Sequence, residues 1–261
     1  MGVQSFNDQA LSFLGREHSG KDAWQALDLA RKTFARHSFD MIYGLPDQSP
    51  DDWARTLSEG LSAEPDHLSL YQLTIEDGTA FQKAVDRGAW HPPDDDKSAQ
   101  FFDLTQQITA KAGLPAYEIS NHARPQTRSV HNLNYWQGGE YIGIGPGAHG
   151  RVFIDGTRCA TETYLRPEHY LRAVEQDRSG ASLIDPLDDN AQLTERLTMG
   201  LRLYDGISLY ADDIFYRDES RVDRLHWLIE QGMLTHDCGH LSATKDGARL
   251  LNMVIGHLLN G

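Results

Sequence analysis

The first seventy-odd residues alternate between the hydrophobic period of a strand and that of a helix, and this alternation restricts the fold more than any other feature of the sequence. Short apolar runs at Gly2–Phe6, Ser38–Tyr43 and His67–Leu73 predict strands, and Lys21–Arg36 predicts a helix between the first two. Because the connections are short, we expect parallel strands with right-handed crossovers, and therefore an α/β fold.

A second helix is predicted to begin after Ser49. The Ser49 hydroxyl can cap free backbone amides, and Pro50 suits the first helical position. Trp53, Leu57 and Leu61 then recur every four residues, so we expect them to form the buried stripe of this helix.

The rest of the chain divides into further segments. We expect a helix at Asp94–Ala112, a short strand at Tyr117–Ser120, and a variable linker over residues 157–186. The barrel-like part is thus assigned to residues 1–156, and a small C-terminal domain to residues 187–261. Three helical segments and a polar hairpin predict a mainly helical, winged-helix-like arrangement for that domain; the helices are expected at Asn190–Leu203, Tyr210–Tyr216 and Arg221–Gln231.

Cysteine content and charge exclude several classes of protein. Cys159 and Cys238 are the two cysteines of the chain, which excludes a disulfide framework and an all-cysteine zinc or iron–sulfur site built within it. We find no secretion signal and no apolar run of about 18 residues, so we expect a cytoplasmic protein without a transmembrane segment. The formal net charge of −14 argues against nucleic-acid binding.

Three polar residues at the predicted strands are candidates for ligand binding. Asp40 places a carboxylate inside an apolar strand, where it could accept a hydroxyl or cation, or form a structural pair with an arginine. Gln4 is a similar polar group in the first strand. Arg16 follows that strand and could hold a carboxylate or phosphate, or be a solvated surface residue.

A glycine-rich segment, Gly143–Gly150, formally contains the G-x-G-x-x-G pattern. A dinucleotide-binding motif needs a helix directly after the glycines, whereas Arg151–Gly156 predicts a strand entering a turn. We therefore expect a backbone-lined loop that approaches a ligand closely.

Histidines offer two further possibilities. His131 precedes Tyr135 and Trp136, and it could ligate haem iron, hold a planar ligand, or be structural. His236, Cys238 and His240 alternate along the chain, which could place three metal-capable side chains on one face, but they fall on a predicted hairpin tip where polar residues are expected anyway.

Segments throughout the chain occur in the order and spacing of one known family: Gly2–Asp8, Leu14–His18, Phe39–Pro46, Leu68–Glu76, Tyr117–Asn121, His131–Trp136 and Gly143–Gly150. Together they resemble the HemW family of radical S-adenosylmethionine (SAM) haem chaperones, which is related to the oxygen-independent coproporphyrinogen III oxidase HemN. The resemblance implies the C-terminal portion of a partial (β/α)6 barrel, followed by the winged-helix-like domain.

The resemblance also implies ligands and site residues. SAM and haem are the expected ligands, and an unidentified acceptor protein would receive the haem. Arg16 suits the SAM carboxylate and Asp40 its ribose hydroxyls, while His131 would bind haem. The matching positions are Gln4, Arg16, Asp40 and Thr74 for SAM, Gly143, Gly145 and Gly147 for a loop over the ligand, and His131 for haem.

The sequence departs from the family at its start. Family members begin with three further strands and a C-x-x-x-C-x-x-C loop that holds a [4Fe–4S] cluster, whereas this chain begins at what matches the fourth strand. We expect a truncated chaperone that neither assembles this cluster nor cleaves SAM reductively. Alternatives are a coproporphyrinogen oxidase-like radical enzyme and a non-enzymatic acidic interaction module; no catalytic residue is assigned.

Overall fold

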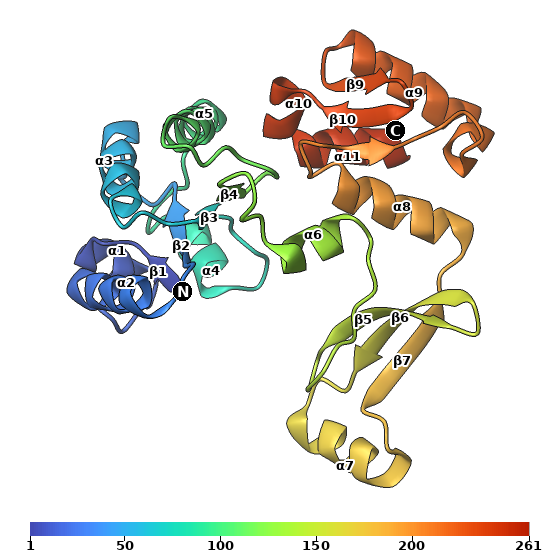
Figure 1. The fold of residues 1–261 in the computed structure, drawn as a ribbon, viewed down its shortest axis with the longest axis horizontal. Coiled ribbons are helices and arrows are strands. Elements are labelled where there is room, and N and C mark those ends of the chain that lie inside the picture. Colours follow the sequence, from blue (N-terminus) through green and yellow to red (C-terminus); the bar gives the residue numbers. More distant parts are fainter. Residues whose placement is uncertain (261) are drawn as a thin grey trace. The chain divides into compact units, whose positions relative to one another are not determined.

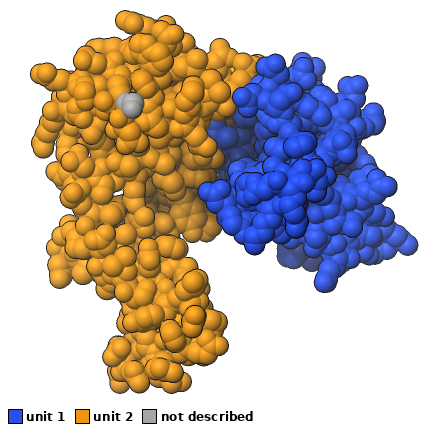
Figure 2. Space-filling model, turned by 180° about the vertical axis from the view of Figure 1, so that it is seen from behind, with its two compact units in different colours: residues 1–129 blue, residues 130–261 orange. Residues whose placement is uncertain are grey.

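The computed structural model describes residues 1–260, which form two compact units (Figure 1). Unit 1 comprises Met1–Ser129, and unit 2 begins at Val130 (Figure 2). None of the described helices combines the length and hydrophobicity that crossing a bilayer demands.

Unit 1 is built on a four-stranded sheet in the order β1-β2-β3-β4. β1 (Gly2–Gln4), β2 (Ser38–Tyr43) and β3 (His67–Gln72) are parallel, which confirms the α/β prediction. β4 (Asn121–Ala123) is antiparallel to β3.

Helices connect and cover these strands. α3 begins as predicted: the Ser49 hydroxyl accepts from the backbone N–H of Asp52 at 3.1 Å, and the Asp52 carboxylate accepts from the backbone N–H of Ser49 at 3.1 Å. The helices of unit 1 are α1 (Asp8–Phe13), α2 (Gly20–Thr33), α3 (Pro50–Leu61), α4 (Ala80–Asp86) and α5 (Asp95–Lys111).

The core of unit 1 lies on one face of the sheet. Phe39, Met41 and Tyr43 of β2 are buried there and belong to one apolar cluster with Trp53 of α3. The Trp53 Nε1–H donates to the Thr105 hydroxyl of α5 at 2.8 Å, which satisfies a buried donor. Because strand residues alternate between faces, the even-numbered residues of β2 point to the opposite face.

The short strand predicted at Tyr117–Ser120 is wrong, because the strand begins only at Asn121. The backbone N–H of Tyr117 donates to the Asn121 carbonyl at 3.1 Å, so the predicted segment forms a tight loop leading into β4. The polar sequence of β4 carries no strand signal of its own; pairing with β3 defines it.

Unit 2 begins with α6 (Val130–Trp136) and a three-stranded antiparallel sheet. β5 (His149–Ile154) and β6 (Thr157–Thr163) are joined by a two-residue turn, Asp155-Gly156, whose φ angles are 49° and 80°. Positive φ at both residues and the Asp-Gly sequence are typical of a type I′ hairpin turn.

Residues 157–186, expected as a linker, are structured. They form β6, α7 (Pro167–Asp177) and β7 (Ala181–Pro186), and β7 pairs with β6. The expectation differs from the structure because β7 is exposed along most of its length, so it lacks the alternation of a half-buried strand. The compact units also divide at residues 129 and 130 rather than near residue 156.

The remaining residues combine helices with a small sheet in the order β8-β10-β9. The helix predicted at Tyr210–Tyr216 is instead a short 3₁₀ turn at Ile214–Arg217. The elements are α8 (Asp189–Gly200), β8 (Ile207–Ser208), α9 (Glu219–Glu230), β9 (Leu234–Asp237), β10 (His240–Ala243), α10 (Lys245–Arg249) and α11 (Leu251–Asn260).

Candidate functional site

The sheet of unit 1 brings Gln4 and Asp40 together on the face opposite the core. Asp40 is half-buried in β2, in register with Gly2 on one side and Ser69 on the other. Gln4 has a φ of 66°, and its amide Nε2 lies 2.8 Å from where a Cβ of Gly2 would be. The glutamine amide therefore occupies the space above Gly2, the residue in register with Asp40.

Arg16 and Thr74 follow the carboxyl ends of parallel strands, where barrel folds place ligand contacts. Arg16 is exposed, and within residues 1–260 its side chain has neither a hydrogen bond nor an ion pair. Thr74 is exposed just beyond β3, and its hydroxyl donates to the Gln72 carbonyl at 3.3 Å. Neither side chain contacts Asp40 in the described part of the chain.

A cavity of about 760 Å³ in unit 1 lies where β1 and β2 end. Asn7, Asp47 and Arg55 contribute to its lining, whereas Gln4 and Asp40 do not. This cavity is therefore separate from the polar face on which the sequence-predicted residues lie.

A buried polar chain on this face was missed by the sequence analysis. The Ser38 hydroxyl lies 2.8 Å from Nδ1 of His67, and Nε2 of His67 lies 2.9 Å from the Tyr117 hydroxyl. Burial lowers the pKa of His67, so its imidazole is neutral near pH 7. The sequence signal that could have indicated this chain is the alternation of the polar residues Ser38 and Asp40 with apolar neighbours in β2, which predicts a polar face.

His122 of β4 lies in the core on the other face of the sheet. Its Nδ1 is 2.9 Å from the Thr109 hydroxyl, which itself donates to the Thr105 carbonyl at 2.8 Å. Since the hydroxyl has one proton, Nδ1–H of His122 must be the donor to it. Burial, together with the neighbouring His67, lowers the pKa of His122 to about 3.

His131 lies in α6 of unit 2 and begins a row of aromatic rings. Its exposed ring packs edge-on against Tyr135 with centroids 4.5 Å apart, and Tyr135 packs edge-on against Tyr141 at 4.4 Å. An exposed imidazole beside aromatic rings can coordinate a metal centre carried by a flat ligand.

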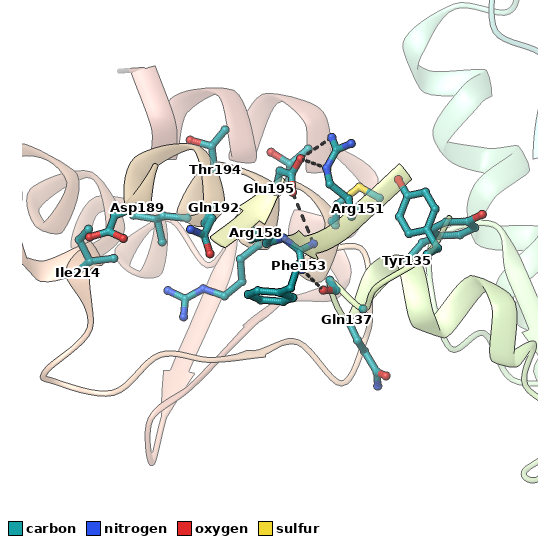
Figure 3. A pocket seen from close by; sticks show the side chains of 17 residues that line it. Tyr135, Gln137, Arg151, Phe153, Arg158, Asp189, Gln192, Thr194, Glu195 and Ile214 are labelled. Atoms are coloured by element: carbon teal, nitrogen blue, oxygen red, sulfur yellow. Dashed lines mark hydrogen bonds and ion pairs between the residues drawn. The ribbon is translucent and has the colours of Figure 1, made fainter. Parts of the chain in front are cut away.

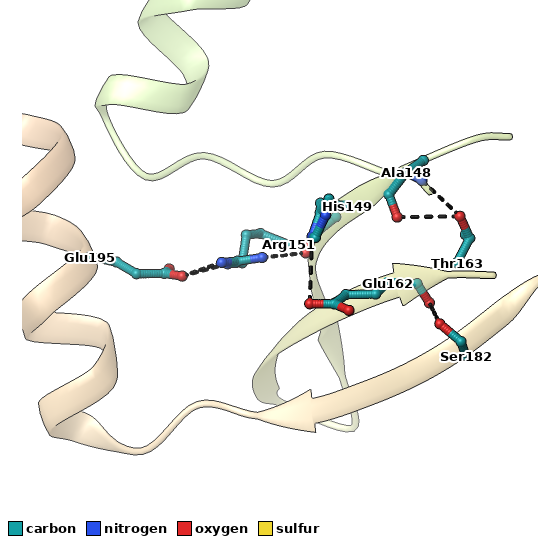
Figure 4. A network of polar contacts seen from close by, with 8 residues as sticks. Ala148, His149, Arg151, Glu162, Thr163, Ser182 and Glu195 are labelled. Carbon is teal, nitrogen blue, oxygen red and sulfur yellow. Dashed lines mark hydrogen bonds and ion pairs between the residues drawn. The ribbon is translucent and has the colours of Figure 1, made fainter. Parts of the chain in front are cut away.

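The glycine-rich loop follows this row and is fixed to β6. Gly145 and Gly147 have φ angles of 101° and 70°, and a Cβ on Gly143 would lie 2.4 Å from the His149 carbonyl oxygen. The Thr163 hydroxyl donates to the Gly145 carbonyl at 2.6 Å. It also accepts from the Ala148 N–H at 2.8 Å (Figure 4). A strand, β5, follows the loop, as predicted.

The hairpin residues considered as metal ligands have other partners. His236 lies 2.9 Å from the Leu209 carbonyl through Nε2, and His240 contacts the Asp205 carbonyl in the same way. No group of three potential metal-ligating side chains occurs among residues 1–260.

A cavity of about 700 Å³ lies within unit 2, between the end of α6, the hairpin β5–β6 and α8 (Figure 3). Arg151 of β5 binds the Glu195 carboxylate of α8 through Nε at 2.6 Å and Nη2 at 2.5 Å. This ion pair raises the pKa of the Arg151 guanidinium. Tyr135 and Tyr141 from the aromatic row also line the cavity.

Comparisons with known proteins agree with this architecture. The HemN C-terminal domain family matches residues 187–250. Among solved structures, coproporphyrinogen III oxidase (HemN) from Escherichia coli, a radical SAM enzyme, superimposes with a TM-score of 0.77 over 100% of this chain and 63% of that one, at 20% identity. The chain thus has the α/β fold of a radical SAM protein with a HemN-type C-terminal domain.

Curated relatives define the family more narrowly. "Heme chaperone HemW" of E. coli is 34% identical over 98% of this chain and 66% of its own length. "Radical S-adenosyl methionine domain-containing protein 1, mitochondrial" of Bos taurus is 36% identical over 100% of this chain and 61% of its own length. The chain belongs to the HemW family of radical SAM proteins, and it spans less than two thirds of the length of these relatives. Because the bovine protein is named mitochondrial, a cytoplasmic location for this chain stays a prediction.

Proposed function

We propose that this chain acts in a HemW-type haem chaperone, which binds haem and SAM and delivers the haem to an acceptor protein. The observation that carries the proposal is the exposed His131 ring, which heads the aromatic row beside a cavity in unit 2. An exposed imidazole is a suitable axial ligand for haem iron. The names of the relatives support haem as the cargo.

Haem titration tests this proposal. Wild type, His131→Ala and a matched control, His226→Ala, would be titrated with haem while the Soret band is followed. His226 is also exposed and also lies in unit 2. We expect saturable binding by wild type and the control, and a shifted or lost Soret band for His131→Ala. Identical spectra and affinities for all three proteins would refute the role of His131.

The residues that we propose for SAM are Gln4, Arg16, Asp40 and Thr74, and those on the sheet fit this ligand. The half-buried Asp40 carboxylate can accept two ribose hydroxyls, and the Gln4 amide above Gly2 adds a donor and an acceptor. The unpaired Arg16 guanidinium can bind a carboxylate. When bound, SAM would supply a sulfonium-activated adenosyl group.

Calorimetry can test the SAM site separately from haem. Asp40→Asn is expected to weaken SAM binding about tenfold or more, because it removes a charged hydrogen-bond acceptor. Asp28→Asn, a change in an exposed residue of α2, serves as the control. Equal SAM affinities for wild type and Asp40→Asn would exclude the proposed contact.

A [4Fe–4S] cluster does not fit the residues of this chain. Such a cluster is held by thiolates, usually four. Cys159 is buried in β6 and Cys238 is exposed on the β9–β10 turn, and they are the two cysteines of the chain. We therefore assign no step to a cluster held by these residues.

A further inference from the structure

The cavity of unit 2 gathers three guanidinium groups in a chain that is acidic overall. Three arginines and two carboxylates line it, although the chain has a formal net charge of −14. They are Arg151, Arg158, Arg196, Asp189 and Glu195. A cation inside a partly enclosed space attracts anionic ligands more strongly than one on an open surface.

The three guanidinium groups differ in how closely they are paired with carboxylates of the protein. Arg151 uses Nε and Nη2 on Glu195 and donates through Nη1 to the Gly150 carbonyl at 2.9 Å. Arg196 donates to the Asp213 carboxylate at 2.6 Å. Both groups are therefore paired directly with a carboxylate.

Arg158 is the guanidinium with the longest contact to a carboxylate. Its Nη1 donates to the Gly138 carbonyl at 2.7 Å, which fixes the side chain, while Nη2 is 3.7 Å from Glu195 Oε2, beyond hydrogen-bonding distance. Only 13% of the Arg158 side chain is exposed. A half-buried guanidinium that lines a cavity, with one Nη group outside hydrogen-bonding distance of Glu195, is well suited to bind a carboxylate.

Aromatic rings provide an apolar wall next to this charge. Phe153 pairs with Arg158 across the β5–β6 hairpin, so both side chains lie on the same face of the sheet. Tyr135 and Tyr141 line the same cavity, and the His131 ring packs against Tyr135. A volume of about 700 Å³ is within the range of natural small-molecule sites.

We propose that this cavity binds a flat ligand bearing a carboxylate, with Arg158 as the donor to the carboxylate and the three rings against the apolar body. The identity of the ligand rests on the proposed function: a haem has a flat macrocycle and two propionates. Glu195 competes with the ligand carboxylate for Arg158, so it holds the site in a neutralised state until the ligand enters. His131 would then ligate the haem iron, and Arg158 would bind a propionate at the edge of the macrocycle.

The test measures the contribution of the ligand carboxylates to binding in the absence of iron. Full-chain wild type, Arg158→Gln, Arg158→Lys and Glu195→Gln would be titrated with metal-free protoporphyrin IX and with its dimethyl ester, in the same detergent, by fluorescence. For the free acid we expect affinity to fall about tenfold or more in Arg158→Gln, to recover partly in Arg158→Lys, and to rise in Glu195→Gln. The dimethyl ester should bind all four proteins weakly and alike.

Two results would overturn this inference, and they differ from failure of the proposed function. Equal affinity of wild type for acid and ester, or an unchanged affinity in Arg158→Gln with an unchanged melting temperature, would remove Arg158 from the site. Haem titration of the same proteins supplies the distinction: haem binding that needs His131 but not Arg158 retains the chaperone proposal and refutes this one. Absence of saturable haem binding to wild type refutes the proposed function itself.

Discussion

The imidazole of His122 should make the stability of unit 1 depend on pH, and replacing it with asparagine should remove that dependence. His122 is buried against α5, where its Nδ1–H donates to the Thr109 hydroxyl. An asparagine side chain can place its Nδ2–H near the same position, so His122→Asn retains this donor without a titratable group.

The sign and size of the effect follow from the two pKa values. The pKa of His122 is about 3 in the folded chain, against 6.5 for an unperturbed histidine. Between these values the unfolded chain binds more protons, so the free energy of unfolding rises with pH and falls on acidification. At pH 5 the loss relative to pH 8 is about 2 kcal/mol, since each pKa unit corresponds to about 1.4 kcal/mol.

Urea unfolding of the full chain, followed by circular dichroism at pH 8 and pH 5, measures this loss. His67 also has a lowered pKa and contributes with the same sign, but it is present in both proteins and cancels in the comparison. We expect wild type to lose about 2 kcal/mol more than His122→Asn. The exposed His91→Asn should behave like wild type. Equal losses for wild type and His122→Asn would show that folding does not lower the pKa of His122, which would refute the reasoning.

Three further substitutions test local features of the fold. Ser49→Ala removes the cap of α3 and should lower the free energy of unfolding by about 1 kcal/mol in urea titrations; no change would mean that the capping box is not formed. Thr105→Val leaves the Trp53 indole N–H buried without its acceptor, at a cost of about 1–3 kcal/mol, whereas Thr105→Ser should cost less. Gly143→Ala forces a Cβ against the His149 carbonyl and should speed amide hydrogen exchange in the glycine-rich loop; unchanged exchange there would contradict the close approach.

Sequence reasoning succeeded where the signal is local. β2 and β3 of unit 1 alternate polar and apolar residues, and α3 has a serine cap followed by a repeating apolar stripe, so these elements could be predicted from neighbouring residues. β4 and β7 could not, because one has a polar sequence defined by its partner strand and the other is exposed along most of its length. Their existence depends on pairing with distant residues.

The same distinction applies to the candidate site. Asp40 could be placed on the face opposite the core because its neighbours Phe39 and Met41 are apolar, whereas the position of Gln4 depends on a register shift and a positive φ that the sequence does not encode. The ion pair of Arg151 with Glu195 joins residues 44 apart, and His67 meets Tyr117 across 50 residues. No periodicity in the sequence encodes either contact, so the cavity of unit 2 and the buried polar chain of unit 1 emerged only from the structure.

The two-residue turn between β5 and β6 also constrains how the chain can change in length. Arg151 and Arg158 stand on opposite strands of this hairpin, and the Asp155-Gly156 turn sets the register that puts both on one face. Inserting or deleting one residue in β6 next to the turn would move Arg158 to the face now occupied by Cys159, even though no residue of the cavity had been replaced. Length variation should therefore be tolerated poorly at this surface turn, unlike at most exposed loops.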